Sequence, residues 1–223
     1  GSNYARQVNT LIGTKGVGLT SGYLYPGATY PYGMVQFTPS YFSKRSGFVI
    51  NQLSGGGCEH MGNFPTFPVK GKLKMSPDNI LNYRINISEE KGHAGYYEAK
   101  VQEDIHAKLT VTERTGMASY EYPADQQYGT VIIGGGISAT PIEQAAIVIT
   151  APNKCEGYAE GGNFCGLRTP YKVYFVAEFD TDALESGTWK RNELKPNTTF
   201  AEGEYSGVYF TFDVNKKKNI QYK

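Results

Sequence analysis

Apolar and polar residues alternate with a period of two through much of the chain after residue 96. In "YYEAKVQ", Tyr97, Ala99 and Val101 fall on one face, and Glu98 and Lys100 fall on the other. The same pattern recurs in "IHAKLTVTER", "YKVYFVAEFD" and "GVYFTFDV". This period is typical of antiparallel strands with one face on a core and the other toward water or a second layer. These segments therefore predict half-buried antiparallel strands.

Other segments show different patterns. The short apolar runs "GTVIIGGGI" and "AAIVIT" indicate fully buried strands, and only "YARQVNTLI" near the start suggests a helical turn. The first seventy residues are rich in glycine, proline and aromatic residues, which predicts short strands joined by long, packed loops. A chain of 223 residues is a common length for one all-β domain. We therefore expect residues 1–223 to form a single large antiparallel β-sandwich with minimal helix.

Composition and charge narrow the possible functions. The 27 glycines and 18 tyrosines agree with many turns and short strands. With 22 basic and 21 acidic residues, the chain lacks the positive charge expected of a nucleic-acid-binding protein. No run of 18 apolar residues is present, so no membrane span is expected. The leading Gly1-Ser2 is typical of a cloning scar, so we expect that an export leader was removed.

The cysteines leave two alternatives open. Cys155 and Cys165 flank "CEGYAEGGNFC", and a disulfide between them would stabilise an exported protein by roughly 2–3 kcal/mol on the chain-entropy model. Two buried free thiols fit the sequence equally well. Cys58 lies apart from this pair in the segment "QLSGGGCEHMGNFPTFP", residues 52–68.

This glycine-rich segment is the strongest candidate for a binding loop. It lacks the Gly-Lys-Ser/Thr ending of a phosphate loop, and no helix-forming stretch follows it. Its glycines allow close approach of the backbone to a ligand. Cys58, Glu59 and His60 are consecutive and cannot all point one way, so we expect no metal here. A sugar suits this composition best, whereas the alternative is a loop that only packs internally.

Candidates for acid–base chemistry are weak. The carboxylates of Glu59, Glu113, Glu143 and Glu178 each fit an ordinary sheet surface, and no Gly-x-Ser-x-Gly nucleophile motif is present. His106 is expected on the exposed face of its strand. The residues themselves therefore predict no catalytic group, only an exportable sandwich with a face suited to a polar ligand.

Five segments nevertheless resemble a known family, in fixed order over almost the whole chain. They are "VNTLIGTKG", "PGATYPYGMVQFTP", "LSGGGCEHMGNFPTFP", "GYYEAKVQEDIHAKLTVTERTGMASYEYP" and "YKVYFVAEF". Together they resemble the N-terminal domain of glycoside hydrolase family 92, the calcium-dependent exo-α-mannosidases. The resemblance implies a galactose-mutarotase-like sandwich followed by an (α/α)6 barrel, in a secreted or periplasmic enzyme.

The resemblance also implies a mechanism and a site. An acid and a base from the barrel, about 6.5–9.5 Å apart, would act with inversion, and calcium would be held mainly by the barrel rather than by this domain. The 223 residues end before such a barrel, so the isolated chain is expected to be inactive. The residues implied to contact or approach a mannose-containing glycan are Gly55, Gly57, Cys58, Glu59, His60 and Asn63.

One departure affects this interpretation. Many family members have "FSHTHLSG" where this chain has "FVINQLSG", so the linkage specificity does not carry over. Two other classes of function stay open from the sequence. The chain would be a stand-alone carbohydrate-binding module if no barrel follows, or a purely architectural sandwich if its loop contacts no sugar.

Overall fold

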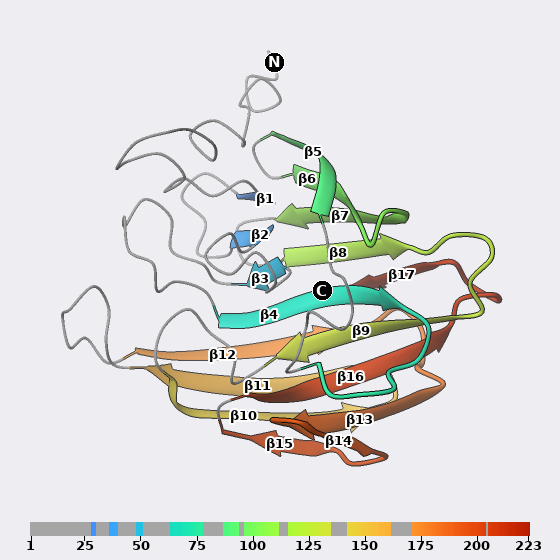
Figure 1. Ribbon diagram of the computed structural model, residues 1–223. Helices are drawn as coiled ribbons and strands as arrows, with labels where there is room; N and C mark the ends of the chain where they lie inside the picture. Colours follow the sequence, from blue (N-terminus) through green and yellow to red (C-terminus); the bar gives the residue numbers. More distant parts are fainter. Residues whose placement is uncertain are drawn as a thin grey trace.

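The structure is a computed structural model with β-strands in two facing layers (Figure 1). It describes residues 28–29, 36–39, 48–50, 63–77, 87–93, 96–111, 116–134, 142–161, 171–203 and 205–223. Within these ranges every helix or strand element is a β-strand, and all strand pairings are antiparallel. The predicted all-β antiparallel sandwich is confirmed.

One layer is an eight-stranded sheet. Its strands, in spatial order, are β1 (Ala28–Thr29), β2 (Gln36–Pro39), β3 (Phe48–Ile50), β4 (Asn63–Lys70), β9 (Tyr128–Gly134), β16 (Ser206–Asp213), β13 (Glu185–Lys190) and β14 (Glu193–Pro196).

The opposite layer consists of two smaller sheets. The five-stranded sheet contains β17 (Asn219–Tyr222), β8 (Gly116–Glu121), β7 (Ile105–Val111), β6 (Tyr96–Val101) and β5 (Ile87–His93). The four-stranded sheet contains β12 (Tyr171–Glu178), β11 (Lys154–Gly161), β10 (Ile142–Ala151) and β15 (Phe200–Glu202).

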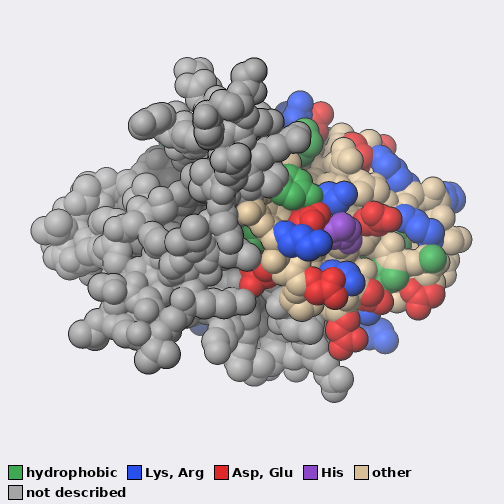
Figure 2. Space-filling model, turned by 90° about the horizontal axis from the view of Figure 1, so that it is seen from above, with side chains coloured by type: hydrophobic (Ala, Val, Ile, Leu, Met, Phe, Trp, Pro, Cys, Tyr) green, Lys and Arg blue, Asp and Glu red, His purple; other side chains and the backbone are tan. Residues whose placement is uncertain are grey.

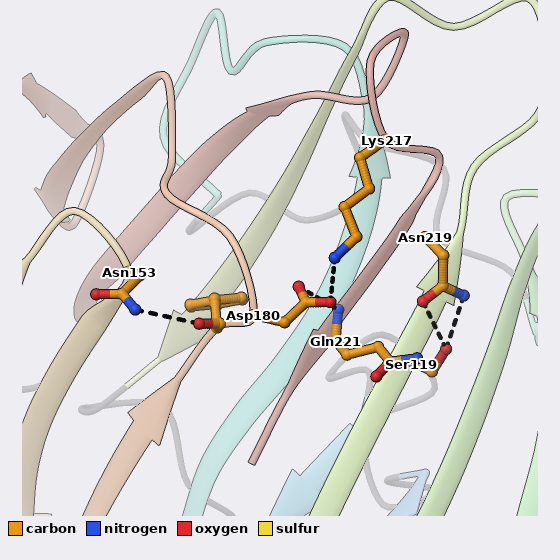
Figure 3. A network of polar contacts seen from close by, with 7 residues as sticks. Ser119, Asn153, Asp180, Lys217, Asn219 and Gln221 are labelled. Atoms are coloured by element: carbon orange, nitrogen blue, oxygen red, sulfur yellow. Dashed lines mark hydrogen bonds and ion pairs between the residues drawn. The ribbon is translucent and has the colours of Figure 1, made fainter.

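The chain end joins these two smaller sheets. Phe179, directly after β12, forms an isolated antiparallel bridge with Tyr222 of β17. Glu178 and Lys223 exchange two backbone hydrogen bonds of 2.9 and 3.1 Å. The Asp180 side chain supports the junction, because its carboxylate forms an ion pair with Lys217 and accepts a hydrogen bond from the backbone N–H of Gln221 (Figure 3).

The main core lies between the layers and follows the predicted alternation. Tyr97, Ala99 and Val101 of β6 are buried, as predicted. The run in β9 is buried on both faces, also as predicted. The prediction of a fully buried "AAIVIT" is wrong, because Val148 of β10 is 37% exposed while Ile147 is buried. The outer face of the four-stranded sheet is open there, so the strand is buried on one face only.

A second apolar cluster covers the outer face of the eight-stranded sheet. It consists of Phe67, Val69, Ile132, Trp189 and Tyr209, with Leu73 and Leu194 packed against it. Leu73 belongs to the segment after β4, which folds back in front of the sheet (Figure 1). This covering explains why β16 is buried on both faces although its sequence alternates.

Gly207 is essential to this cluster because a Cβ there would lie 2.2 Å from the Trp189 ring and 2.4 Å from the Ile133 carbonyl oxygen. We expect Gly207→Ala to lower the free energy of unfolding by about 1–3 kcal/mol, since overpacking forces neighbouring groups to shift. Urea denaturation measures this change. Gly71→Asn is the control, because no atom lies within 4 Å of a Cβ at Gly71 and asparagine tolerates its φ of 76°. Equal effects of both substitutions would contradict the packing argument.

Candidate functional site

The strand pairing places both ends of the candidate loop. Ile50 at the end of β3 pairs with Asn63 at the start of β4. Residues 51–62 therefore connect two neighbouring strand ends at one end of the eight-stranded sheet. Of the residues implicated by sequence, only Asn63 lies in a described strand, and nothing is described of its side chain. The five others, Gly55, Gly57, Cys58, Glu59 and His60, lie outside the described residues.

Buried hydroxyl groups anchor β4 to the opposite layer, three residues beyond Asn63. The Thr66 hydroxyl lies 2.6 Å from the Tyr222 hydroxyl, which lies 2.8 Å from the Tyr120 hydroxyl. Burial is the main cause that raises the pKa values of both tyrosines, so they remain neutral hydrogen-bonding groups. This chain of hydroxyls crosses the core and holds the start of β4 relative to β8 and β17.

The same end of the sheet carries an aromatic–cation pair that the sequence analysis missed. Gly207 near the start of β16 pairs with Gly134 at the end of β9, and Ser206 pairs with Lys190 at the end of β13. The β13–β14 turn therefore lies at the same end of the sheet as the start of β4. There the Arg191 guanidinium carbon lies 5.1 Å from the centre of the Tyr205 ring. The two residues belong to separate turns, so no spacing in the sequence links them. Arg191 follows β13, three strand spacings or about 14 Å from β4, and Tyr205 precedes β16, two spacings or about 10 Å from β4.

A separate polar cluster lies on the outer face of the five-stranded sheet, where acidic and basic side chains are interspersed (Figure 2). The Tyr96 hydroxyl donates a 2.7 Å hydrogen bond to Glu98, whose carboxylate lies 3.3 Å from His106 Nε2. The His106 side chain is 39% exposed, which confirms the predicted exposed face. The hydrogen bond from Tyr96 and the contact with His106 lower the pKa of Glu98, which makes it an ordinary surface carboxylate rather than a proton donor at neutral pH.

Removing the Tyr96 hydroxyl tests whether its hydrogen bond lowers the pKa of Glu98. We expect Tyr96→Phe to raise the pKa of Glu98 toward its ordinary value, measured by NMR titration of the carboxyl carbon. Because the pKa of Glu98 is lowered in the folded state, its hydrogen bond with Tyr96 stabilises the fold at pH values above the unfolded-state pKa of Glu98. This stabilisation is lost as the pH falls through the folded-state pKa. Tyr128→Phe is the control, since Tyr128 bonds to Gln127 instead. An unchanged Glu98 pKa in Tyr96→Phe would contradict the assigned cause.

Cys155 is a free, buried cysteine in the structure. Burial raises the pKa of its thiol to about 12, so the thiol is not a reactive nucleophile at neutral pH. Its sequence partner in the disulfide alternative, Cys165, lies outside the described residues. Of the two alternatives, Cys155 is therefore a buried free thiol in this structure.

The described side chains offer no ready metal centre. Among them, no group of three His, Cys, Asp or Glu residues is placed to hold a metal ion. The regular elements within the described ranges likewise include no helix long and apolar enough to cross a membrane.

The two facing antiparallel layers define the class of this protein, a large β-sandwich domain with a long glycine-rich connection between β3 and β4. A family model described as the glycosyl hydrolase family 92 N-terminal domain matches residues 7–223. The chain therefore belongs to this family, which confirms the resemblance found in the sequence.

Known proteins agree with this membership. A protein of Arthroderma benhamiae named an uncharacterized secreted glycosidase is 32% identical in an alignment of 138 residues, and the match covers 53% of this chain and 17% of that protein. The solved structure of the family GH92 glycosyl hydrolase ccman5 superposes with a TM-score of 0.83 at 22% identity. It matches 99% of this chain, which spans 32% of that chain.

Two further structures come from Bacteroides thetaiotaomicron. One is a family GH92 α-mannosidase with a TM-score of 0.79 at 22% identity, matched over 96% of this chain and 32% of its own. The other is a family GH92 inverting mannosidase with a TM-score of 0.76 at 21% identity, matched over 96% of this chain and 30% of its own. At these identities the likeness establishes a shared fold, and this chain spans about a third of each protein.

Proposed function

We propose that this chain is the N-terminal, substrate-cleft domain of a secreted or periplasmic exo-α-mannosidase that cleaves α-mannosidic bonds with inversion. The family match over residues 7–223 is the observation that carries the proposal. The names of the matched structures, an α-mannosidase and an inverting mannosidase, support the substrate class and the stereochemistry. The name of the fungal relative, a secreted glycosidase, supports export.

In this proposal residues 1–223 form one domain of a larger two-domain enzyme. The chain covers 30–32% of the matched structures, which leaves room in proteins of that length for a catalytic barrel. The general acid and the general base come from that barrel, about 6.5–9.5 Å apart, with space for the attacking water. Calcium is held mainly by that barrel too, as membership of the family implies.

The role of this domain is to bind and orient the mannose-containing glycan. The connection between Ile50 and Asn63 leaves and re-enters the sheet at adjacent strand ends, which suits a loop that projects from the sandwich. Its glycines allow the backbone to approach the sugar, and a carboxylate accepts strong hydrogen bonds from hydroxyl groups. The proposed contact residues are Gly55, Gly57, Cys58, Glu59, His60 and Asn63.

Product stereochemistry tests the proposed reaction. The full-length protein is incubated with the methyl glycoside of an α-linked mannobiose, so that free mannose comes only from the non-reducing end, and the anomeric protons of the released mannose are followed by NMR from the first minutes. We expect β-mannose to appear first and the α-anomer to form later by mutarotation, because inversion delivers water to the opposite face of the ring. Release of α-mannose first, or no release at all, would overturn the proposal.

A further inference from the structure

Arg191 and Tyr205 form an exposed pair at the end of the eight-stranded sheet from which the candidate loop leaves. Arg191 is exposed in the β13–β14 turn, and Tyr205, directly before β16, is 44% exposed. The guanidinium carbon lies 5.1 Å from the centre of the Tyr205 ring, within the range of a cation–π contact. We call these two residues the Arg–Tyr pair. Together they present a planar charged group and an aromatic ring to solvent.

The backbone of both residues is held in an uncommon conformation. The φ angles of Arg191 and Tyr205 are 51° and 56°, in the left-handed region that bulky side chains rarely adopt. The Arg191 N–H donates a 2.7 Å hydrogen bond to the Tyr205 carbonyl oxygen, and the Ser76 hydroxyl donates one to the Arg191 carbonyl oxygen. Backbone strain of this kind persists where the surrounding structure holds it, and it is concentrated at ligand-binding sites. The two turns therefore hold the Arg–Tyr pair in place before any ligand binds.

The polar groups of the pair have hydrogen-bonding capacity to spare. Among the residues that the structure describes, no hydrogen bond or ion pair reaches the Arg191 guanidinium or the Tyr205 hydroxyl. By contrast, Lys72, which lies over the ring of Tyr128, also forms an ion pair with Glu185 at 3.3 Å. A guanidinium has five N–H donors, and a phenol hydroxyl both donates and accepts. Groups that are already held in place lose little conformational freedom when a ligand binds to them.

A sugar residue matches the chemistry of the pair. The apolar face of a pyranose ring packs on an aromatic ring, and its hydroxyl groups accept hydrogen bonds from a guanidinium. The charge near the pair is balanced in the sequence, because Lys190 and Arg191 are accompanied by Glu193, Glu202 and Glu204. Balanced charge favours a neutral polar ligand over an anion, since an anion is attracted by a surplus of positive charge.

The distance of the pair from the start of β4 suits a different sugar residue from the one at the loop. Tyr205 is two strand spacings or about 10 Å from β4, and Arg191 is one spacing further. The strand between β4 and β16 is β9, which ends at Gly134 and is followed in sequence by Gly135 and Gly136. Glycine has no side chain, so these three positions place no bulky group between the loop and the pair.

We propose that the Arg–Tyr pair is a distal glycan-binding subsite, which holds a sugar residue beyond the two that flank the cleaved bond. Tyr205 packs against the sugar ring, and the Arg191 guanidinium donates hydrogen bonds to its hydroxyl groups. The inference rests on the proposed function for the identity of the glycan, and it adds a preference for longer substrates. The pair binds and orients the glycan and takes no part in the chemical step.

Substrates of two lengths test the subsite in the full-length protein. The short substrate is the methyl glycoside of an α-linked mannobiose, and the long substrate is the mannopentaose of the same linkage. In Tyr205→Asn and Arg191→Asn, we expect the ratio of kcat/KM for the long substrate to that for the short substrate to fall about tenfold. This is the order contributed by one aromatic contact or one hydrogen bond to a charged group. The loss is expected in KM, because such a contact is made equally with substrate and transition state.

The variants are chosen to keep the fold and to isolate the pair. Asparagine tolerates the left-handed φ angles of both positions. Tyr128→Asn is the matched control, because Tyr128 forms a cation–π contact with Lys72 at the opposite end of the same sheet, and we expect it to keep the parent ratio. An equal fall for both substrates in the Tyr205 and Arg191 variants would indicate a structural role. That result, or a ratio equal to that of the parent, would overturn the inference.

A binding measurement separates the subsite from the proposed reaction. Saturation-transfer NMR follows mannopentaose on the full-length protein, with a calcium chelator present to suppress hydrolysis. We expect saturation of the sugar residues remote from the non-reducing end to fall in Tyr205→Asn and Arg191→Asn and to persist in Tyr128→Asn. This result in a protein that releases no mannose would support the subsite and refute only the proposed reaction. An active protein with equal saturation in all variants refutes only the subsite, and absence of saturation in the parent would also overturn it.

Discussion

Glu59→Gln in the full-length enzyme is expected to lower kcat/KM for an α-mannoside by about tenfold to a hundredfold. In the proposed site this carboxylate accepts hydrogen bonds from sugar hydroxyls. Hydrogen bonds to charged groups contribute about 1.5–3 kcal/mol, and each 1.36 kcal/mol is a factor of about ten in rate. Glutamine keeps the size of the side chain and removes its charge. A rise in KM alone would indicate binding shared by substrate and transition state, whereas a fall in kcat would indicate contacts made in the transition state.

The control for this prediction is Glu121→Gln. Glu121 is exposed at the end of β8, on the five-stranded sheet. We expect this variant to retain the parent kcat/KM, and circular dichroism confirms the fold of both variants. If Glu59→Gln is folded and stays within a few-fold of the parent, the loop does not bind the sugar and the sandwich is architectural.

Phe179→Ala is expected to have the largest effect on stability, a loss of about 3–5 kcal/mol in the free energy of unfolding. Phe179 is 2% exposed, and its ring centre lies 4.8 Å from Phe210, 5.0 Å from Phe212 and 4.8 Å from Tyr222. These rings belong to both layers, so truncation opens a cavity where the layers and the two smaller sheets meet. Domains of this kind have total stabilities of about 5–15 kcal/mol, so the variant approaches the limit of folding.

Phe200→Ala provides a matched control for that prediction. It removes the same ring from a residue that is 54% exposed, so we expect a change within about 0.5 kcal/mol. Urea unfolding of the 223-residue chain, followed by tyrosine and tryptophan fluorescence, measures both variants. A similar loss in the two variants would contradict the placement of Phe179 at the junction of the layers.

Local pattern predicted much of the sandwich because each strand had to bury one face. The alternation of apolar and polar residues in β6 and β7 predicts which side chains face the core. Ile105 and Leu109 of β7 are fully buried, as this alternation predicts. In β10 the pattern was misleading, because an exposed Val148 looks the same in sequence as a buried one. Val148 is exposed because the outer face of the four-stranded sheet is open, and no local sequence pattern indicates which face of a sheet is open.

Contacts between distant segments were not predictable from pattern at all. The bridge between Phe179 and Tyr222 and the hydroxyl contact between Thr66 and Tyr222 depend on how complete sheets meet. The pair of Arg191 and Tyr205 likewise arises from two turns that the sheet brings together. The candidate loop was found through motif resemblance, since its glycines and consecutive polar residues do not by themselves specify a ligand.

The most direct test of the central claim is α-mannosidase activity of the full-length protein, with and without a calcium chelator, beside the 223-residue chain. The account predicts activity in the full-length protein only, and loss of that activity with the chelator. Steady hydrolysis by the purified 223-residue chain would contradict the division of the site between two domains. No activity in either protein would contradict the proposed function and leave a carbohydrate-binding module as the better account.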